Sequence, residues 1–551
     1  MLRIAKTSLL TLTGLWALAF AARAQSPAAS TLSKVWVPDL GNGMYKNPVL
    51  YADYSDPDVV RVGTDYYLTS SSFSSVPGLQ VLRSKDLVNW TIIGAALPVQ
   101  PPRDRYDQVQ PGNGVWAPAL RFHRGEFYLY YPDPDLGIFV TKAKNPAGPW
   151  SAPVCVKQAK GWIDPCPFWD EDGRAYLVHA FAGSRAGIKS VIHVSEMVPD
   201  GLSLLGEDKL VFDGHKDHPT IEGPKFYKRH GYYYIFAPGG GVKPGWQVVL
   251  RSKNVFGPYE DKIVLAQGKS SINGPHQGAW VDTPDGKQDW FLHFQDQGAY
   301  GRVVHLQPMT WKNDWPVMGL DPDGDGTGEP VRTYHKPAVS SKVALATPAT
   351  SDEFSGKTLG WQWHWQANPQ PSWYSLTAAP GSVRLAAAPR PAAYQNFWQV
   401  PSLLVQKLPA EQFMATTKLT FRPQAEGEKA GLVIMGMDYA YLGVTYQAGH
   451  LQLAQVMCTS ADKGAAEVPS PAITVPTSQP LYLRVAVRPG AKCQFSYSLD
   501  GQQFTPLGAE FTAREGRWVG AKMGVFCLSP GTEATAGYAD VDWWRVAPIA
   551  E

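Results

Sequence analysis

The 551-residue sequence predicts an all-β protein, in which a five-bladed β-propeller precedes an antiparallel β-sandwich. Three observations lead to this prediction. A unit of roughly 50–60 residues recurs five times in the first part of the chain, a period typical of propellers and other repeat arrays. Long amphipathic helical patterns are few, whereas aromatic residues, glycine and proline are abundant. After about residue 351, apolar and polar residues alternate as they do in half-buried strands.

Each repeat begins with a polar or aromatic residue close to a proline and continues through a turn into an aromatic strand. The five leading residues are Asp56, Trp116, Asp164, Glu222 and His276. A single copy would be explained most simply as a turn residue beside proline. Five copies in phase favour a propeller, and so does a second motif that recurs at residues 84–90, 140–150 and 249–259. The first strand of each blade lines the central channel, so the leading residues are expected to converge there.

Three carboxyl groups would then meet an indole and an imidazole in one funnel. Burying carboxyl groups together is unfavourable unless their pKa values shift or a cation offsets the repulsion, and such groupings cluster at active sites. The formal net charge is +2 with no basic block, which argues against a nucleic acid or an anionic membrane surface as a partner. Twenty tryptophans suit stacking on sugar rings, although most are expected in the core.

The N-terminus has the pattern of a secretory signal, predicted for residues 1–24. Arg3 and Lys6 form its positive end, residues 9–20 its apolar stretch, and residues 22–24 an A-x-A cleavage site. Export to the periplasm or the exterior is therefore expected, with an uncleaved anchor as the alternative. No other membrane span is expected, and residues 25–44 are interpreted as a lead-in segment.

The five cysteines show no C-x-x-C spacing, which argues against a cysteine-based zinc cage. A disulfide between Cys155 and Cys166 is conceivable in an exported protein, but the predicted fold does not require one.

The order of the five leading motifs resembles the propeller of glycoside hydrolase family 43. These motifs are Asp56-Pro57-Asp58, Trp116-Ala117-Pro118, Asp164-Pro165, Glu222-Gly223-Pro224 and Gly274-Pro275-His276. Residues 84–90 and 273–311 resemble xylosidase and arabinofuranosidase members that carry a C-terminal sandwich. The resemblance covers nearly the whole mature chain. It implies an inverting glycosidase, whose two working carboxyl groups stand about 6.5–9.5 Å apart to admit a water molecule.

By this resemblance Asp56 is the general base, Glu222 the general acid and Asp164 the carboxylate that orients the acid and raises its pKa. A turn network without catalytic function is the alternative for all three. His276 resembles a histidine that supports the acid or holds a water shell around a central calcium; a satisfied core histidine is the alternative.

Three further residues are candidates for sugar binding. Trp116 and Phe73 are expected to line the subsite for the terminal sugar, although Phe73 suits a core position nearly as well. Arg302 looks like a family arginine that hydrogen-bonds this sugar, with a structural arginine as the alternative.

A second candidate cation site follows the last blade. Asp321, Asp323 and Asp325 have the spacing of the first half of a calcium loop, but the twelfth position is Arg332 instead of glutamate. A structural Ca²⁺ is therefore a hypothesis, against a plain acidic glycine-rich turn. The reaction itself would need no cofactor.

We expect the propeller at residues 45–335, a linker at 336–350 and the sandwich at 351–551. The closing residues 539–544 resemble the last strand of the concanavalin-like sandwich attached to such enzymes. The sandwich could brace the propeller, lend a side chain to the pocket as it does in some members, or bind polysaccharide.

The resulting hypothesis is an exo-acting hydrolase of plant hemicellulose, with arabinoxylan, xylo-oligosaccharides or xyloglucan side chains as substrates. It would release terminal α-L-arabinofuranose, β-D-xylose or both. An endo-arabinanase and a non-catalytic carbohydrate-binding propeller are the alternatives.

Overall fold

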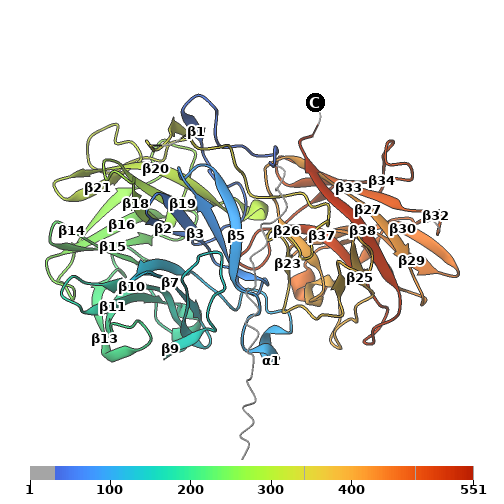
Figure 1. Cartoon of the computed structure of the whole chain (residues 1–551), viewed down its shortest axis with the longest axis horizontal. Coiled ribbons are helices and arrows are strands. Elements are labelled where there is room, and N and C mark those ends of the chain that lie inside the picture. The colour runs from blue at the N-terminus through green and yellow to red at the C-terminus, as the bar shows by residue number, and fades with distance from the viewer. Residues whose placement is uncertain (1–31, 341, 478, 550–551) are drawn as a thin grey trace, which may run out of the picture.

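The computed structural model describes residues 32–340, 342–477 and 479–549, and nearly all of its regular elements are strands. Two lobes lie side by side, a propeller drawn from blue to yellow and a sandwich drawn in orange and red (Figure 1). The predicted fold class, a five-bladed propeller followed by a β-sandwich, is confirmed. The predicted signal at residues 1–24 lies outside the described residues, as do residues 25–31 of the lead-in segment.

Five antiparallel four-stranded sheets form the propeller, and each sheet is built from consecutive strands. Blade one comprises β2 (Asp58–Val62), β3 (Asp65–Thr69), β4 (Gly78–Ser84) and β5 (Trp90–Leu97), and blade two β6 (Ala119–His123), β7 (Glu126–Asp133), β8 (Gly137–Ala143) and β9 (Val154–Gln158). Blade three comprises β10 (Trp162–Trp169), β11 (Ala175–Phe181), β12 (Val191–Met197) and β13 (Leu204–Asp213), and blade four β14 (Lys225–Arg229), β15 (Tyr232–Gly239), β16 (Trp246–Ser252) and β17 (Glu260–Leu265). Blade five comprises β18 (His276–Asp282), β19 (Asp289–Asp296), β20 (Arg302–Lys312) and β21 (Trp315–Met318).

The first strands of blades one to four lie against one another in turn around the axis. In blade five, β18 packs against β15 of blade four and closes the ring against β2 of blade one. Apolar side chains fill the space between blades; Tyr176 and Ile192 of blade three, for example, share one cluster with Ile235 and Leu250 of blade four. The pair β1 (Met44–Lys46) and β22 (Thr333–His335) joins the two ends of the propeller segment. This packing makes the start of each inner strand a fixed point near the axis.

Helical segments are short. They are α1 (Arg103–Tyr106), α2 (Gly183–Ala186) and the 3₁₀ turns η1 (Gly298–Tyr300), η2 (Phe397–Gln399) and η3 (Ala461–Lys463). Among the described residues, none of these helices has the length or the apolar character needed to cross a bilayer.

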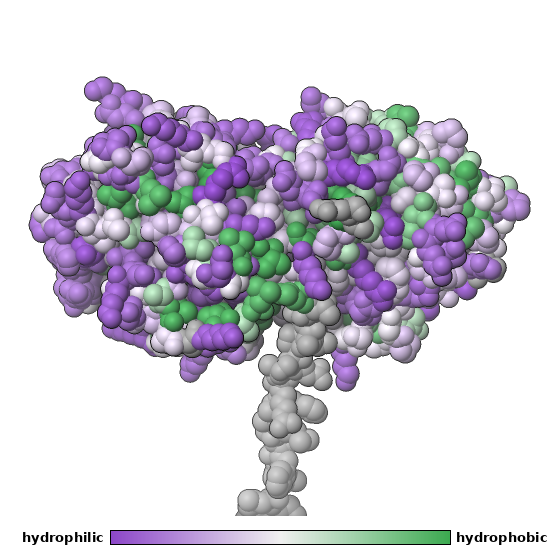
Figure 2. Space-filling model, turned by 90° about the horizontal axis from the view of Figure 1, so that it is seen from above, coloured by the Kyte–Doolittle hydropathy of each residue, from purple (hydrophilic) through white to green (hydrophobic). Residues whose placement is uncertain are grey.

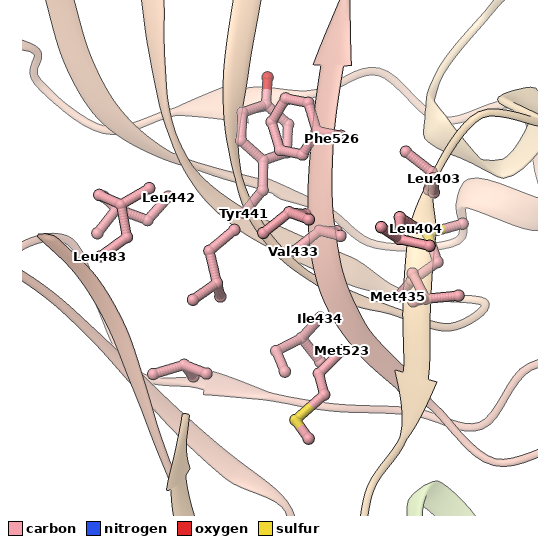
Figure 3. Packing of buried hydrophobic residues seen from close by; sticks show 14 of the residues in the cluster. Leu403, Leu404, Val433, Ile434, Met435, Tyr441, Leu442, Leu483, Met523 and Phe526 are labelled. Carbon is pink, nitrogen blue, oxygen red and sulfur yellow. The ribbon is translucent and has the colours of Figure 1, made fainter. Parts of the chain in front are cut away.

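Two antiparallel eight-stranded sheets form the sandwich. One contains β23 (His364–Trp365), β26 (Leu404–Lys407), β37 (Lys522–Leu528), β28 (Lys429–Met435), β29 (Tyr439–Gln447), β30 (His450–Cys458), β31 (Val468–Pro469) and β32 (Ile473–Val475). The other contains β24 (Tyr374–Ser375), β25 (Val383–Ala386), β38 (Tyr538–Ala547), β27 (Phe413–Arg422), β33 (Leu481–Arg488), β34 (Lys492–Ser498), β35 (Thr505–Pro506) and β36 (Phe511–Thr512). The inward residues of the two sheets pack together, as Leu442 of β29 and Leu483 of β33 do (Figure 3).

All five cysteines are free thiols. The conceivable disulfide between Cys155 and Cys166 is therefore not present. Cys155 is exposed on β9, whereas the buried sulfur of Cys166 accepts hydrogen bonds from Arg121 Nη2 at 2.9 Å and from the Phe226 amide at 3.3 Å.

The two lobes share an extensive boundary. Residues 336–350 contain no strand or helix in their described part, and residues 346–350 line an interdomain cavity together with the N-terminal residues Ser33 and Trp36. Direct contacts include a β-bridge between Val76 and Trp365 and two hydrogen bonds between Asn368 and Gln100. The Asn368 Nδ2 donates to the Gln100 carbonyl, and the Asn368 Oδ1 accepts from the Gln100 amide. Seen from above, the surface is mostly hydrophilic, with patches of hydrophobic side chains, one of them near the middle of the face (Figure 2).

Two lysines of the sandwich point into this boundary. Lys407 and Lys522 line a cavity that also contains Asp53 of the propeller and His364. Loss of hydration lowers the pKa of Lys407 to about 7 and that of Lys522 to about 8, although the Asp53 carboxylate favours the charged form of each lysine. Burial between the two lobes therefore disfavours the charged forms of Lys407 and Lys522.

We predict that Lys407→Met stabilises the protein more at about pH 6 than at about pH 10. The folded pKa, near 7, lies below the ordinary value of 10.5. Between these values the folded protein binds fewer protons than the unfolded chain, so its stability rises with pH and the penalty is complete below about pH 7. Each pKa unit corresponds to about 1.4 kcal/mol, so the difference between the folded and the ordinary pKa of Lys407 sets the upper limit of the gain.

Thermal denaturation of the wild type and of Lys407→Met at both pH values measures this difference. Lys492→Met, at a lysine whose side chain is 56% exposed, is the matched control and should show no such dependence. An equal gain for Lys407→Met at both pH values would contradict the assignment.

Candidate active site

The structure brings the five leading residues to the axis-facing starts of the blades. Asp56 and Glu222 stand just before β2 and β14, Trp116 stands just before β6, and His276 begins β18. Asp164 lies inside β10, where the register with β11 is interrupted between Ile163 and Cys166. Such a bulge re-aims side chains at the rim of a barrel or an active site.

Asp56 and Asp164 also share an unusual backbone conformation. Their φ angles are 54° and 56°, in the left-handed region that non-glycine residues seldom adopt. Backbone conformations of this kind persist where the surrounding structure enforces them, and they concentrate at functional sites. The shared geometry therefore supports a common role for the two carboxyl groups.

Asp56 is buried and bound by three donors. Its Oδ2 accepts hydrogen bonds from Ser55 Oγ at 2.8 Å and Ser71 Oγ at 2.5 Å, and its Oδ1 accepts one from Arg302 Nη1 at 3.1 Å. All three donors, one of them a cation, suit an ionised carboxylate. A fixed, ionised carboxylate is what a general base must provide.

Asp164 is the most enclosed of the three carboxyl groups. Burial, followed by the charges of Glu222 and Asp56, raises the pKa of Asp164 to about 8. The Gly223 amide, which donates to Asp164 Oδ2 at 2.7 Å, and the buried ammonium of Lys225 oppose this rise. Asp164 therefore holds a proton at a pH where an ordinary aspartate has lost it.

Glu222 is the carboxyl group that a ligand can reach, since its side chain is 27% exposed. Its Oε1 lies 3.0 Å from Nε2 of His276, whose ring is buried and packs against Phe294 at 5.3 Å between centroids. His276 Nδ1 has no hydrogen-bond partner among the described residues. The arrangement holds Glu222 at the open side of the carboxyl cluster, where a proton donor to a departing group must stand.

Arg302 links Asp56 to the rest of the site. Its Nη1 donates to Ser55 Oγ at 2.6 Å as well as to Asp56, and its guanidinium lies 4.8 Å from the centre of the Phe294 ring. Only part of its donor set is used by these contacts, so the remaining N–H groups can serve a ligand.

The two aromatic candidates lie together near the carboxyl groups. The Phe73 and Trp116 rings are 6.4 Å apart, Phe73 is buried, and Trp116 is partly exposed. Trp116 Nε1 donates to the Gly112 carbonyl at 2.9 Å, and the Arg185 guanidinium lies 5.4 Å from the Trp116 ring centre. The tryptophan is thus held as a rigid wall.

The sandwich also reaches this region, through a loop that the sequence alone did not identify. Trp518 has a φ of 63° and is 47% exposed, and its Cδ1 is only 3.0 Å from where a Cβ on Gly112 would lie. The Gly520 amide donates to Asp53 Oδ2 at 3.0 Å, and Asp53 Oδ1 accepts the Arg302 amide at 3.0 Å. A Cβ on Gly520 would lie 2.7 Å from the Gly301 nitrogen, so close approach requires glycine here.

The proposed calcium ligands fall into separate places. Ligand atoms of Asp321, Asp323 and Asp325 lie within 4.8 Å of one another, and His276 belongs to no such group among the described residues. Both Asp321 oxygens accept loop amides, from Gly324 at 2.9 Å and Gly326 at 3.0 Å. These contacts also occur in an acidic glycine-rich turn, so calcium stays a prediction.

Comparison with known proteins agrees with this architecture. The family model "Glycosyl hydrolases family 43" matches residues 45–316, and "Beta xylosidase C-terminal Concanavalin A-like domain" matches residues 351–547. A Xylanibacter ruminicola protein named "Putative beta-xylosidase" is 40% identical over 504 residues, covering 90% of this chain and 88% of its own. A non-reducing end α-L-arabinofuranosidase of Bacteroides ovatus is 30% identical, covering 92% and 95%.

Among solved structures, a xylan β-1,4-xylosidase from Bacillus halodurans superposes with a TM-score of 0.81 at 26% identity, covering 91% of this chain and 99% of that one. The propeller, the sandwich and the axial carboxyl groups thus occur together in a chain that belongs to glycosyl hydrolases family 43.

Proposed function

We propose that this glycoside hydrolase is an inverting, exo-acting enzyme that removes α-L-arabinofuranose, β-D-xylose or both from the non-reducing ends of hemicellulose chains. The observation that carries the proposal is the axial carboxyl cluster. It combines a buried Asp56 bound by Arg302 with a partly exposed Glu222 beside His276. The names of the two relatives, a β-xylosidase and a non-reducing end α-L-arabinofuranosidase, support these sugars.

The reaction follows from the different surroundings of the carboxyl groups. Asp56 takes a proton from a water molecule, which attacks the anomeric carbon from the face opposite the leaving group. Glu222 gives its proton to the glycosidic oxygen as that bond breaks. Asp164 lies beside this acid, whose charge helps to raise the pKa of Asp164, and the Gly223 amide that donates to Asp164 ties it to the segment that carries Glu222. No cofactor takes part in these steps.

Several contacts favour a closed pocket over an open groove. Trp116 and Phe73 form one wall, and the sandwich loop that carries Trp518 approaches Gly112, whose carbonyl accepts a hydrogen bond from Trp116. A pocket closed in this way suits one terminal sugar and disfavours the internal cleavage of an endo-arabinanase. A non-catalytic carbohydrate-binding propeller would not require a carboxyl group whose burial is as unfavourable as that of Asp164.

We further propose that the protein is exported and meets oligosaccharides of the plant cell wall. The basic, apolar and small-residue segments of residues 1–24 support this assignment. Occupancy of the Asp321 loop by calcium would stabilise the end of blade five without entering the reaction, as its place after β21 implies.

The first prediction separates the acid from the base. Glu222→Gln should reduce kcat/KM for an unactivated disaccharide by about 10²–10⁴-fold and affect a nitrophenyl glycoside far less, because nitrophenolate leaves without protonation. Asp56→Asn should lower activity on both substrates, since water activation is needed in each case.

Steady-state kinetics on nitrophenyl α-L-arabinofuranoside, nitrophenyl β-D-xyloside and xylobiose provides the test, and NMR of the first-formed anomer reports inversion. Equal losses on activated and unactivated substrates in Glu222→Gln would remove its assignment as the acid. No turnover by a folded wild type would favour the endo-acting or binding alternatives.

The second prediction concerns Asp164. Its folded pKa, near 8, is higher than the ordinary 3.8, so the folded state binds the extra proton and loses stability as pH rises from about 4 to about 8. Asp164→Asn removes the charge and can still accept from Gly223. Its gain in unfolding free energy should therefore grow with pH, by up to about 1.4 kcal/mol for each step of one in pH, while activity falls.

Melting temperatures of this variant and the wild type at about pH 5 and about pH 8 supply the measurement. Asp217→Asn is the control, because the Asp217 side chain is exposed, and its effect on stability should not grow with pH. Asp170 is unsuitable because its carboxylate is paired with Lys228. A gain that did not change with pH would argue against a strongly raised pKa of Asp164.

The third prediction addresses the sandwich loop. Trp518→Ala should raise KM about three- to tenfold for the preferred glycoside and leave the melting temperature within about 1 °C, because a half-exposed aromatic is lost from the rim. Trp361→Ala, at another exposed tryptophan of the sandwich, should leave KM unchanged. Unchanged kinetics in Trp518→Ala would show that the loop only braces the propeller.

A further inference from the structure

Blade three carries a cluster of metal-ligating side chains that takes no part in the proposed reaction. His179 on β11, His193 on β12 and Asp208 on β13 offer ligand atoms that lie within 4.8 Å of one another. His193 Nδ1 is 2.5 Å from Asp208 Oδ2, and His179 Nε2 is 3.8 Å from the same oxygen. Three consecutive strands thus direct two imidazoles and a carboxylate to one point.

Strand register explains why these side chains meet. His179 and His193 are direct cross-strand partners. The β12–β13 ladder shifts register between Val194 and Glu196, and the additional β13 residues include Asp208. The bulge turns the Asp208 carboxylate towards the histidine pair, which a regular ladder would not do at this position.

The hydrogen bonding of His179 leaves one ring nitrogen ready to bind a ligand. His179 is fully buried, and its Nδ1 faces the Ala180 carbonyl oxygen at 3.3 Å, so Nδ1 carries the proton and donates. Nε2 then presents a lone pair, and it has no hydrogen-bond partner among the described residues. A backbone carbonyl that fixes the tautomer behind the ligating nitrogen is typical of metal-binding histidines.

The surroundings hold the rings in place but leave the site open on one side. His179 stacks on Trp162 at 3.7 Å between ring centres, and Phe181 meets the His193 ring edge-on at 4.8 Å. The side chains of His193 and Asp208 remain 18% and 27% exposed, so an ion and a water ligand can enter from solvent. Loss of hydration lowers the pKa of His179 to about 3, which keeps its ring neutral.

The donor set selects the ion. Two imidazoles and one carboxylate suit zinc and neighbouring borderline divalent metals, whereas calcium and magnesium prefer oxygen ligands alone. A tetrahedral zinc with bonds of 2.0–2.1 Å separates its ligand atoms by roughly 3.4 Å. His193 and Asp208 must move apart by about 1 Å to reach this spacing, and the distance from His179 to Asp208 already approaches it.

We propose that His179, His193 and Asp208 form a binding site for Zn²⁺, with water as the fourth ligand, that ties together the three outer strands of blade three. On binding, His193 takes the neutral tautomer that carries its proton on Nε2, so that Nδ1 offers its lone pair to the ion. The site is independent of the carboxyl cluster at the axis. Its expected role is structural, because β13 is the edge strand of the blade and has no neighbour beyond it in its sheet.

The test uses the full-length protein, prepared without a polyhistidine tag and freed of metal by chelation. Calorimetric titration with ZnCl₂ should show one equivalent bound by the wild type, with affinity at least about tenfold weaker in His193→Ala and Asp208→Asn. The matched control is His215→Ala, because His215 and Asp213 form an exposed pair at 2.6 Å with no third ligand among the described residues. It should bind as the wild type does.

Two further measurements cover a variant that folds poorly. Asp208→Asn keeps the size of the side chain, and Co²⁺ in place of Zn²⁺ absorbs visible light much more strongly in a tetrahedral protein site than in water. Zinc should also raise the melting temperature of the wild type and not that of Asp208→Asn. Absence of saturable zinc binding by the wild type, or unchanged affinity in Asp208→Asn, would overturn the proposal.

Discussion

The interaction on which the site depends is the repulsion among the three carboxyl groups that the propeller holds at its axis. Burial and two neighbouring charges raise the pKa of Asp164 to about 8, and the fold tolerates this because opposing contacts are supplied nearby. Arg302 and two serine hydroxyls bind Asp56, while Lys225 and the Gly223 amide lie on the side of Asp164. The burial of neighbouring carboxyl groups thus lowers the stability of the fold, and by raising a pKa it also suits the site to proton transfer.

The propeller makes such an arrangement possible because packing between the blades, and not the site residues themselves, sets the backbone positions at the axis. Strands of neighbouring blades pack against one another around the axis, so the starts of the inner strands cannot separate when like charges are placed on them. The left-handed φ angles of Asp56 and Asp164 are held by this frame. A loop scaffold would relax away from both the strain and the repulsion, whereas packed blades do not.

The repeat made the fold and the main carboxyl groups predictable from the sequence. Each copy joins a leading residue to a turn and an aromatic strand, and a propeller brings such positions together. What the sequence could not supply were contacts between residues distant in the chain. The hydroxyl of Ser71, the amide of Gly520 and the ring of Trp518 carry no pattern of their own, and only folding places them beside Asp56, Asp53 and Gly112.

The cysteines show that residues close in sequence can also fail to meet in the structure. Cys155 and Cys166 are close in sequence, yet they lie on consecutive strands of different blades, one exposed and one buried. The cluster of His179, His193 and Asp208 was equally invisible, because its geometry depends on a register shift in β13. A short separation in sequence predicts contact between residues of one turn. It does not predict which side chains of different strands meet where a β-bulge has changed their direction.

The relation between the two domains follows from a single carboxylate. Asp53 accepts a hydrogen bond from the Arg302 amide with one oxygen and from the Gly520 amide with the other. The backbone that carries Arg302, the residue bound to Asp56, is therefore hydrogen-bonded through Asp53 to the sandwich. The neighbouring lysines, Lys407 and Lys522, lose hydration in the same boundary. A sandwich that merely tethered the enzyme to polysaccharide would not need either feature. Its position, three hydrogen bonds away from Asp56 through Asp53 and Arg302, makes it a structural support of the carboxyl cluster.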